Sequence, residues 1–163
     1  MTRITPAGPV KKKGRSVLQW ELPNACYHVS FSLKKGDSLT PGERRIVLDE
    51  CLYWREKRYQ LFAAVVMPDH VHIVIRPLRD DNEEYWPLSK IIGGIKGYTA
   101  RRINQARGLR GSIWHRNYYS RILRTKGDLR EKIAYVVNNP VKAELVDDPF
   151  KYAFLWLEGQ PPG

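Results

Sequence analysis

Two histidines occur one residue apart in an otherwise apolar stretch, "VVMPDHVHIVIRP", at residues 65–77. Successive side chains of a β-strand point to opposite faces, so His70 and His72 share one face and Val71 points to the other. Two imidazoles on one face can bind a single metal ion. A strand that carries two histidines as ordinary polar surface would have the same spacing, so the pair alone leaves both interpretations open.

A tyrosine and an asparagine share one face of a helix that we predict over residues 128–139. The apolar stripe of this helix consists of Leu129, Ile133, Val136 and Val137. At about 100° per residue, Tyr135 lies well away from this stripe, and Asn139 follows one turn later on nearly the same face. The two residues are candidates for chemistry, although a surface tyrosine and a helix-ending asparagine would give the same pattern.

In combination, these side chains are suited to phosphoryl transfer. Mg²⁺ or Mn²⁺ could be held by the imidazoles of His70 and His72 and the amide oxygen of Asn139, with positions left open for a phosphate. Polarisation of a phosphoryl oxygen would then favour in-line attack by the hydroxyl of Tyr135. A tyrosine hydroxyl has an unperturbed pKa of about 10, so this attack needs a metal or a nearby cation to help remove the proton.

The elements that must position these residues follow one another in the order β-α-β-β-α-β, with a terminal helix. The first helix has a strong start signal, a capping box of Thr40 and Glu43, and the last helix is expected to start at Asp128 with Glu131 and to end before Pro140. The expected elements are a strand at 27–36, a helix from Thr40, two strands joined at Met67-Pro68-Asp69, a helix at about 88–105, a strand at about 119–124 and the last helix.

This order predicts an α+β fold, the ferredoxin-like split β-α-β arrangement. In this fold an antiparallel sheet carries helices on one face and leaves the other face free, and here a C-terminal catalytic helix follows. In the helix at 88–105, Gly93, Gly94 and Gly97 lie off the apolar stripe, although each costs about 1 kcal/mol relative to alanine. A locally loose helix and the close approach of another backbone or a ligand both account for them.

Composition is consistent with a single domain that binds a polyanion. The chain has 163 residues, 42% of them hydrophobic, and a net charge of +11, which favours nucleic acid as a partner. We expect a flexible basic arm over residues 1–19 and one domain over 20–163. Cys26 and Cys51 are expected to be reduced thiols. Because no secretion signal or membrane-spanning run is found, we expect a cytoplasmic, nucleoid-associated protein with no membrane partner.

Three motifs in order resemble a known family: "MPDHVHIVI" (67–75), "SIWHRNYYSRILR" (112–124) and "IAYVVNNPVKAELV" (133–146). Together they resemble the IS200-like single-tyrosine transposases of the HUH superfamily, and among these most of all the REP-associated tyrosine transposases. The resemblance runs from about Tyr27 to Trp156. It supports the ferredoxin-like fold and implies a metal-dependent endonuclease and strand transferase that acts on single-stranded DNA containing a hairpin, such as a REP-like or insertion-sequence-end palindrome.

The resemblance also implies roles for individual residues. His70 and His72 match the paired metal ligands, and Asn139 stands where compact insertion-sequence enzymes usually carry glutamine as a third ligand. Tyr135 matches the nucleophile, which forms a 5′-phosphotyrosine intermediate and frees a 3′ hydroxyl. Tyr118 and Tyr119 are rival nucleophiles, but their motif matches the strand that precedes the catalytic helix. A monomer is favoured, although compact relatives act as dimers.

Basic side chains in three regions are candidates for DNA contacts. Those of the N-terminal arm could follow phosphates, or belong to a solvated tail. The others lie on the glycine-containing helix and around the "WHRNYY" segment, where interleaved aromatic residues suit unpaired bases. The candidates are Lys11, Lys12, Lys13, Arg15, Lys90, Lys96, Arg101, Arg110, Arg116, Arg121 and Arg124. A catalytically inactive protein that binds hairpin DNA or RNA, and an unrelated metal-dependent hydrolase that does not use Tyr135, are the alternative functions.

Overall fold

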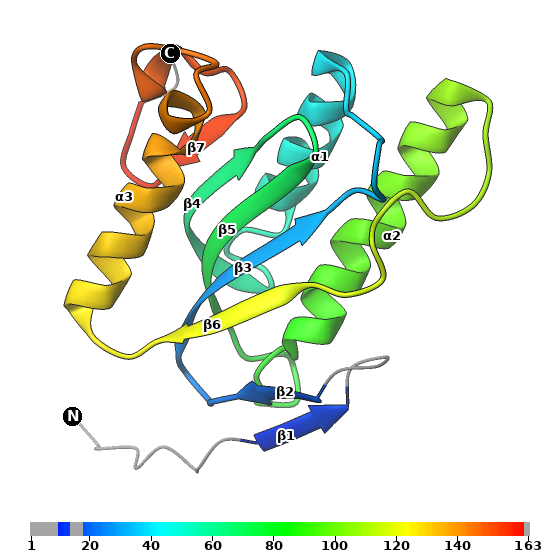
Figure 1. The fold of residues 1–163 in the computed structure, drawn as a ribbon. Helices are drawn as coiled ribbons and strands as arrows, with labels where there is room; N and C mark the ends of the chain where they lie inside the picture. The colour runs from blue at the N-terminus through cyan, green and yellow to red at the C-terminus, as the bar shows by residue number, and fades with distance from the viewer. Residues whose placement is uncertain (1–9, 14–17, 162–163) are drawn as a thin grey trace.

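The computed structural model describes residues 10–13 and 18–161 and places a five-stranded antiparallel sheet at the centre of the chain (Figure 1). The strand order is β6-β3-β5-β4-β7. Its first four members have the order of the ferredoxin-like split β-α-β fold, so the predicted fold class is confirmed. The strands are β3 (Cys26–Ser32), β4 (Tyr59–Val66), β5 (His70–Pro77), β6 (Tyr119–Leu123) and β7 (Leu155–Leu157), and the helices are α1 (Pro41–Tyr53), α2 (Leu88–Arg107), α3 (Lys126–Lys142) and the 3₁₀ helix η1 (Pro149–Lys151).

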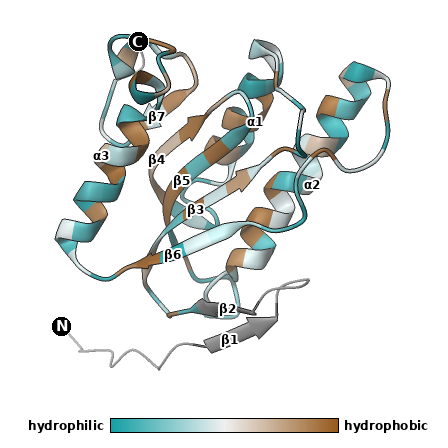
Figure 2. Cartoon of the chain, in the orientation of Figure 1, coloured by the Kyte–Doolittle hydropathy of each residue, from teal (hydrophilic) through white to brown (hydrophobic). Residues whose placement is uncertain are grey.

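Helices cover both faces of the sheet, to different extents. Val71, Ile73 and Ile75 of β5 are fully buried against α1 and α2 on one face. On the other face, Val74 packs in a smaller cluster with Val136 of α3. The predicted free face is therefore partly covered, because the apolar stripe of α3 needs a partner. Figure 2 shows the hydrophobic residues concentrated in β4 and β5, inside this arrangement.

The helix ends agree with prediction for α1 and differ for α3. Thr40 caps α1 with Glu43 as expected. The N-cap of α3 is Thr125, whose hydroxyl accepts a hydrogen bond from the backbone N–H of Asp128 while the Asp128 carboxylate accepts one from the N–H of Thr125. Asp128 is thus the third residue of a capping box and not the cap. The helix also continues past Pro140 to Lys142, because a proline in the last turn removes only one backbone donor.

A two-stranded antiparallel sheet overlaps the range 1–19 that was predicted as a flexible arm and extends two residues beyond it. Its strands are β1 (Val10–Lys13) and β2 (Leu18–Glu21). Three of the candidate DNA-binding lysines, Lys11, Lys12 and Lys13, lie in β1, whereas Arg15 lies outside the described residues. These strands were not predicted, because two four-residue strands carry too little pattern to be distinguished from a basic tail. The flexibility of the arm and the boundary at residue 20 stay predictions.

One glycine of α2 is explained by the close approach of an arginine side chain. A Cβ atom on Gly94 would lie 3.0 Å from Nη1 of Arg58. The Arg58 guanidinium is itself stacked between two indoles, 3.5 Å from the ring centroid of Trp54 and 4.4 Å from that of Trp86. Close approach therefore accounts for Gly94, and the approaching group is a side chain. Among the described residues, no atom beyond the chain neighbours and the helix's own nearby backbone lies within 4 Å of a Cβ built on Gly93, so packing there does not account for that residue.

Arg107 connects the end of α2 to the start of α1. Its Nε lies 2.7 Å from a carboxylate oxygen of Glu43, and its Nη1 lies 2.9 Å from one of Asp37. These hydrogen bonds from Arg107 lower the pKa of both carboxyl groups. Glu43 is buried, so an uncompensated charge would be left inside the protein if the guanidinium were removed.

We expect Arg107→Ala to lower the free energy of unfolding by about 2–3 kcal/mol near neutral pH. The contribution of a carboxyl group with a lowered pKa is present above its ordinary pKa of about 4 and is lost as the pH falls through the folded-state value. The difference between wild type and variant should therefore narrow under acidic conditions. Urea denaturation at neutral and acidic pH measures this. Lys151→Ala, which removes an exposed ion pair with Asp147, should change little, and an equal effect of both substitutions would contradict the prediction.

In the described part of the chain, no helix is both long and apolar enough to cross a membrane. The two cysteines are free thiols, as expected, with Cys51 buried and Cys26 half-buried.

Candidate active site

Three histidines lie together on the face of the sheet that α3 partly covers. His70 and His72 of β5 point to this face as predicted, and their ring centroids are 4.9 Å apart. His28 of β3 joins them, with its ring centroid 5.1 Å from that of His72. His28 was not among the residues predicted from the sequence. Its signal was the alternation of "YHVSFS", in which Tyr27, Val29 and Phe31 are buried on the opposite face.

One ring nitrogen of each β5 histidine is already engaged. Nδ1 of His70 lies 2.7 Å from Oδ1 of Asp69, and Nδ1 of His72 lies 2.9 Å from Nε2 of His28. The Nε2 atoms of His70 and His72 are thus the nitrogens left for another ligand. This is the usual arrangement in metal sites, where a ligating histidine uses one nitrogen for the metal and the other for a hydrogen bond that fixes the ring.

Burial keeps two of the rings neutral. It lowers the pKa of His72 to about 3, with further lowering from His70, His28 and Lys132. It lowers the pKa of His28 to about 4, with additional effects from Lys132 and Arg121. Because both values lie far below neutral pH, these imidazoles carry no charge under physiological conditions. Neutral imidazole is the form that binds a metal ion.

Helix α3 places Tyr135 beside the histidines. Leu129, Ile133 and Val136 pack against the sheet, which leaves Tyr135 at the edge of the contact with 42% of its surface exposed. Its ring centroid is 5.6 Å from that of His72 and 6.0 Å from that of His28. Nζ of Lys132 lies 4.7 Å from the centre of the tyrosine ring. The candidate nucleophile is therefore exposed, close to the histidines and next to a positive charge.

The histidine pair fits a metal ion only if other ligands complete the site. Among the described residues, no three or more histidine, cysteine, aspartate or glutamate side chains are arranged to hold one. Asn139 is half-buried one turn after Tyr135 on α3, and its amide oxygen is a ligand type that hard divalent cations accept. The residues present therefore fit Mg²⁺ or Mn²⁺ as an open site, with further positions taken by water or substrate oxygen. The ligand roles of His70, His72 and Asn139 stay predictions.

The two rival tyrosines differ in position. Tyr118 is half-buried and packs against the core formed with α1 and α2, and burial raises its pKa. Tyr119 pairs with Ser30 on β3 and is 55% exposed, with its ring centroid 6.0 Å from that of His28. Of the two, Tyr119 lies beside the histidine cluster.

The candidate DNA-binding residues do not form one surface with the histidines. Arg121 pairs with His28 across β6 and β3 and is exposed next to the cluster. Three others lie on α2, which packs on the opposite face of the sheet. Of these, Lys96 donates hydrogen bonds from Nζ to the carbonyl oxygens of His115 and Arg116. The three on α2 are Lys90, Lys96 and Arg101. Arg110 and Arg116 lie before β6 and Arg124 lies after it, and all three are exposed.

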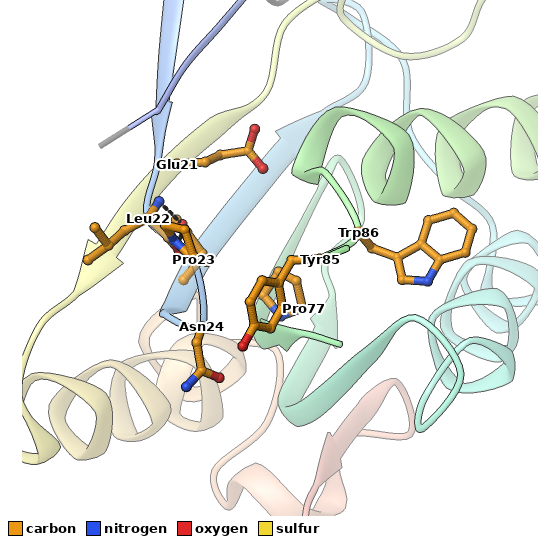
Figure 3. Close-up of a pocket in the computed structure, with 8 residues that line it drawn as sticks. Glu21, Leu22, Pro23, Asn24, Pro77, Tyr85 and Trp86 are labelled. Atoms are coloured by element: carbon orange, nitrogen blue, oxygen red, sulfur yellow. Dashed lines mark hydrogen bonds between the residues drawn. The ribbon is translucent and has the colours of Figure 1, made fainter. Parts of the chain in front are cut away.

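A small pocket lies elsewhere and takes no part in this cluster. One side is formed by the segment from Glu21 to Asn24 and the other by Pro77, Tyr85 and Trp86 (Figure 3). The Glu21 carboxylate also accepts a hydrogen bond of 2.7 Å from the backbone N–H of Leu88, the first residue of α2. None of the predicted catalytic or metal-binding residues lines this pocket.

Comparison with known proteins supports one family. The sequence profile described as "Transposase IS200 like" matches residues 21–139, which include the three clustered histidines, Tyr135 and Asn139. A curated protein of Haemophilus influenzae, provisionally assigned there as a REP-associated tyrosine transposase, is 25% identical over 99 residues. The match covers 55% of this chain and 53% of that protein, so the chain spans about half the length of this relative.

A solved structure has a similar fold. It is a REP-associated tyrosine transposase bound to a REP hairpin, and it superimposes with a TM-score of 0.69 over 86% of this chain and 81% of that chain. The two sequences are 20% identical. At this identity the similarity establishes the fold, in agreement with the strand order described above.

Proposed function

The chain belongs to the IS200-like transposase family, and from this premise we propose that it cuts and rejoins single-stranded DNA next to a hairpin. The observation that carries the proposal is the exposed ring of Tyr135 beside the histidine cluster, at 5.6 Å from His72. An exposed tyrosine beside candidate metal ligands is an arrangement suited to covalent phosphoryl transfer. The REP-hairpin complex of the structural relative supports the choice of a hairpin substrate.

In the proposed reaction, Oη of Tyr135 forms a bond to the phosphorus of a phosphodiester. The P–O3′ bond breaks, and the departing oxygen takes up a proton to become a 3′ hydroxyl, while the tyrosine proton passes to solvent. The 5′ phosphate stays on Tyr135 as a phosphotyrosine. A 3′ hydroxyl that attacks this phosphotyrosine reverses the step, so strands can be joined without ATP.

His70, His72 and Asn139 would hold the divalent cation. A bound Mg²⁺ or Mn²⁺ would supply charge stabilisation at the phosphoryl oxygen. The chain itself contributes the orientation of the His70 imidazole, through Asp69, and a positive charge at Lys132 beside the tyrosine ring. Arg121, exposed beside the histidine cluster, would contact a DNA phosphate.

We also propose that the active unit is a monomer. The histidines and Tyr135 belong to the same chain. The ring centroids of His28 and His72 lie within 6.0 Å of that of Tyr135, and His70 adjoins His72. A second copy is therefore not needed to complete the site. Sedimentation of the protein with its hairpin substrate measures the stoichiometry, and an active species with two protein chains would contradict this part of the proposal.

The test is to incubate the protein with a labelled single-stranded oligonucleotide that contains a hairpin and unpaired flanks, with Mn²⁺ or with EDTA. We expect a protein–DNA adduct that resists SDS and forms only with the metal. An unstructured oligonucleotide of the same length serves as the control. Hairpin binding without any adduct would instead support an inactive binding protein.

A further inference from the structure

In the proposed reaction His70 and His72 are metal ligands, whereas His28, the third histidine of the cluster, has no direct role. It is buried, with 4% of its surface exposed, and it is the hydrogen-bond partner of His72. The two ring planes are 21° apart, so an N–H in the plane of one ring can point at the in-plane lone pair of the other. A second imidazole at this place does more than fill space, because a hydrogen-bonded ring also decides where its neighbour carries a proton.

We propose that His28 is a positioning residue that fixes the tautomer and ring orientation of His72. The inference rests on the proposed function, in which His72 is a metal ligand. When Nδ1 of His72 carries the shared proton, Nε2 of His28 accepts it and Nε2 of His72 keeps a lone pair. When Nε2 of His28 carries the proton, Nε2 of His72 is protonated and cannot ligate. The first arrangement is the one that leaves His72 able to bind a metal.

The buried environment of His28 lowers the stability of the folded protein, which is unusual for a residue whose only role is packing. Its Nδ1 is buried and finds no hydrogen-bond partner in the part of the chain that the structure describes. A buried polar atom without a partner destabilises the folded state, and a residue of similar shape without that atom would avoid the cost. His28 also contacts the Tyr135 ring at 74°, with centroids 6.0 Å apart. It therefore contacts both the ligand that it orients and the proposed nucleophile.

The test compares His28→Phe, which keeps a ring but offers no acceptor, with His28→Gln, whose amide can replace Nε2. We expect the affinity for Mn²⁺, measured without DNA by electron paramagnetic resonance, to fall about 10- to 100-fold in the Phe variant. The Gln variant should recover most of it. His115→Phe, at an exposed histidine outside the cluster, should bind Mn²⁺ as wild type does. Urea denaturation in EDTA confirms that each variant is folded, and His28→Leu replaces the Phe variant if that one does not fold.

A second measurement separates this inference from the proposed function. The ¹⁵N shifts of labelled histidines in the metal-free protein report the tautomer of His72, which we expect to be protonated at Nδ1 in wild type and mixed in the Phe variant. If wild type binds no Mn²⁺ but His72 has this tautomer, the metal-dependent function fails and the role of His28 stands. An unchanged tautomer and unchanged Mn²⁺ affinity in a folded Phe or Leu variant would overturn the inference.

Discussion

Tyr135→Phe should abolish the covalent adduct and lower strand cleavage by at least about 10³-fold, the order of loss found when a covalent nucleophile is removed. The substitution deletes only the hydroxyl oxygen, so the ring contacts with His28 and His72 and the packing of α3 are kept. Hairpin binding should be unchanged for the same reason. Adduct formation is followed on denaturing gels, and binding is followed by fluorescence anisotropy of the same labelled hairpin.

Tyr119→Phe is the matched control, because its ring lies at the same 6.0 Å from that of His28 and is also exposed. We expect it to form the adduct at the wild-type rate. Loss of the adduct in Tyr119→Phe with retention in Tyr135→Phe would identify Tyr119 as the nucleophile. Cleavage without an adduct in Tyr135→Phe would instead indicate that water attacks, as in a metal-dependent hydrolase.

The parts of this site that could be predicted depend on local periodicity. The two-residue period of a strand is enough to place His70 and His72 on one face. The helical period is enough to separate Tyr135 from the stripe of Ile133 and Val136. Neither inference needs to know which element lies beside which. The order of elements along the chain then determined the fold class, because few topologies connect that order without crossing loops.

His28 could not be placed in the same way. Its alternation with Tyr27 and Val29 puts it on the polar face of β3, but many polar residues satisfy that condition. Its hydrogen bond to His72 follows from the pairing register, in which Val74 lies opposite His28 and His72 lies opposite Ser30. A shift of one residue would have turned His28 to the other face. Contacts of this kind depend on tertiary pairing, which the sequence of one strand does not contain.

The ends of α3 were mispredicted because two local signals overlap. Thr125 with Asp128 and Asp128 with Glu131 both have the spacing of a capping box, and the structure uses the first. Pro140 marks a helix end in isolation, but here the residue is buried. The N–H groups of Ala143 and Leu145 still bind the carbonyl oxygens of Asn139 and Pro140. Packing and these bonds offset the loss of one donor, so Asn139 lies within the helix and keeps a fixed relation to Tyr135.

The second large effect is expected from the β5 histidines. His70→Ala and His72→Ala should each weaken Mn²⁺ binding and lower adduct formation by at least about 100-fold, because a metal that polarises a phosphoryl oxygen contributes several kcal/mol to the transition state. His70 is the cleaner substitution, since it is half-buried and its partner Asp69 is exposed, so little of the fold depends on it. Titration of Mn²⁺ and the adduct assay measure the two effects.

The double variant distinguishes a shared metal site from two separate contributions. When two residues act as a unit, removal of either one already abolishes most of their joint effect. The double variant His70→Ala,His72→Ala should therefore bind Mn²⁺ and form the adduct hardly less well than either single variant. Hairpin binding in EDTA should be the same for all three, because the imidazoles then hold no cation. His115→Ala controls for the loss of a histidine outside the cluster. A loss in the double variant equal to the two single losses combined, or wild-type Mn²⁺ affinity in either single variant, would mean that the pair does not hold one metal ion.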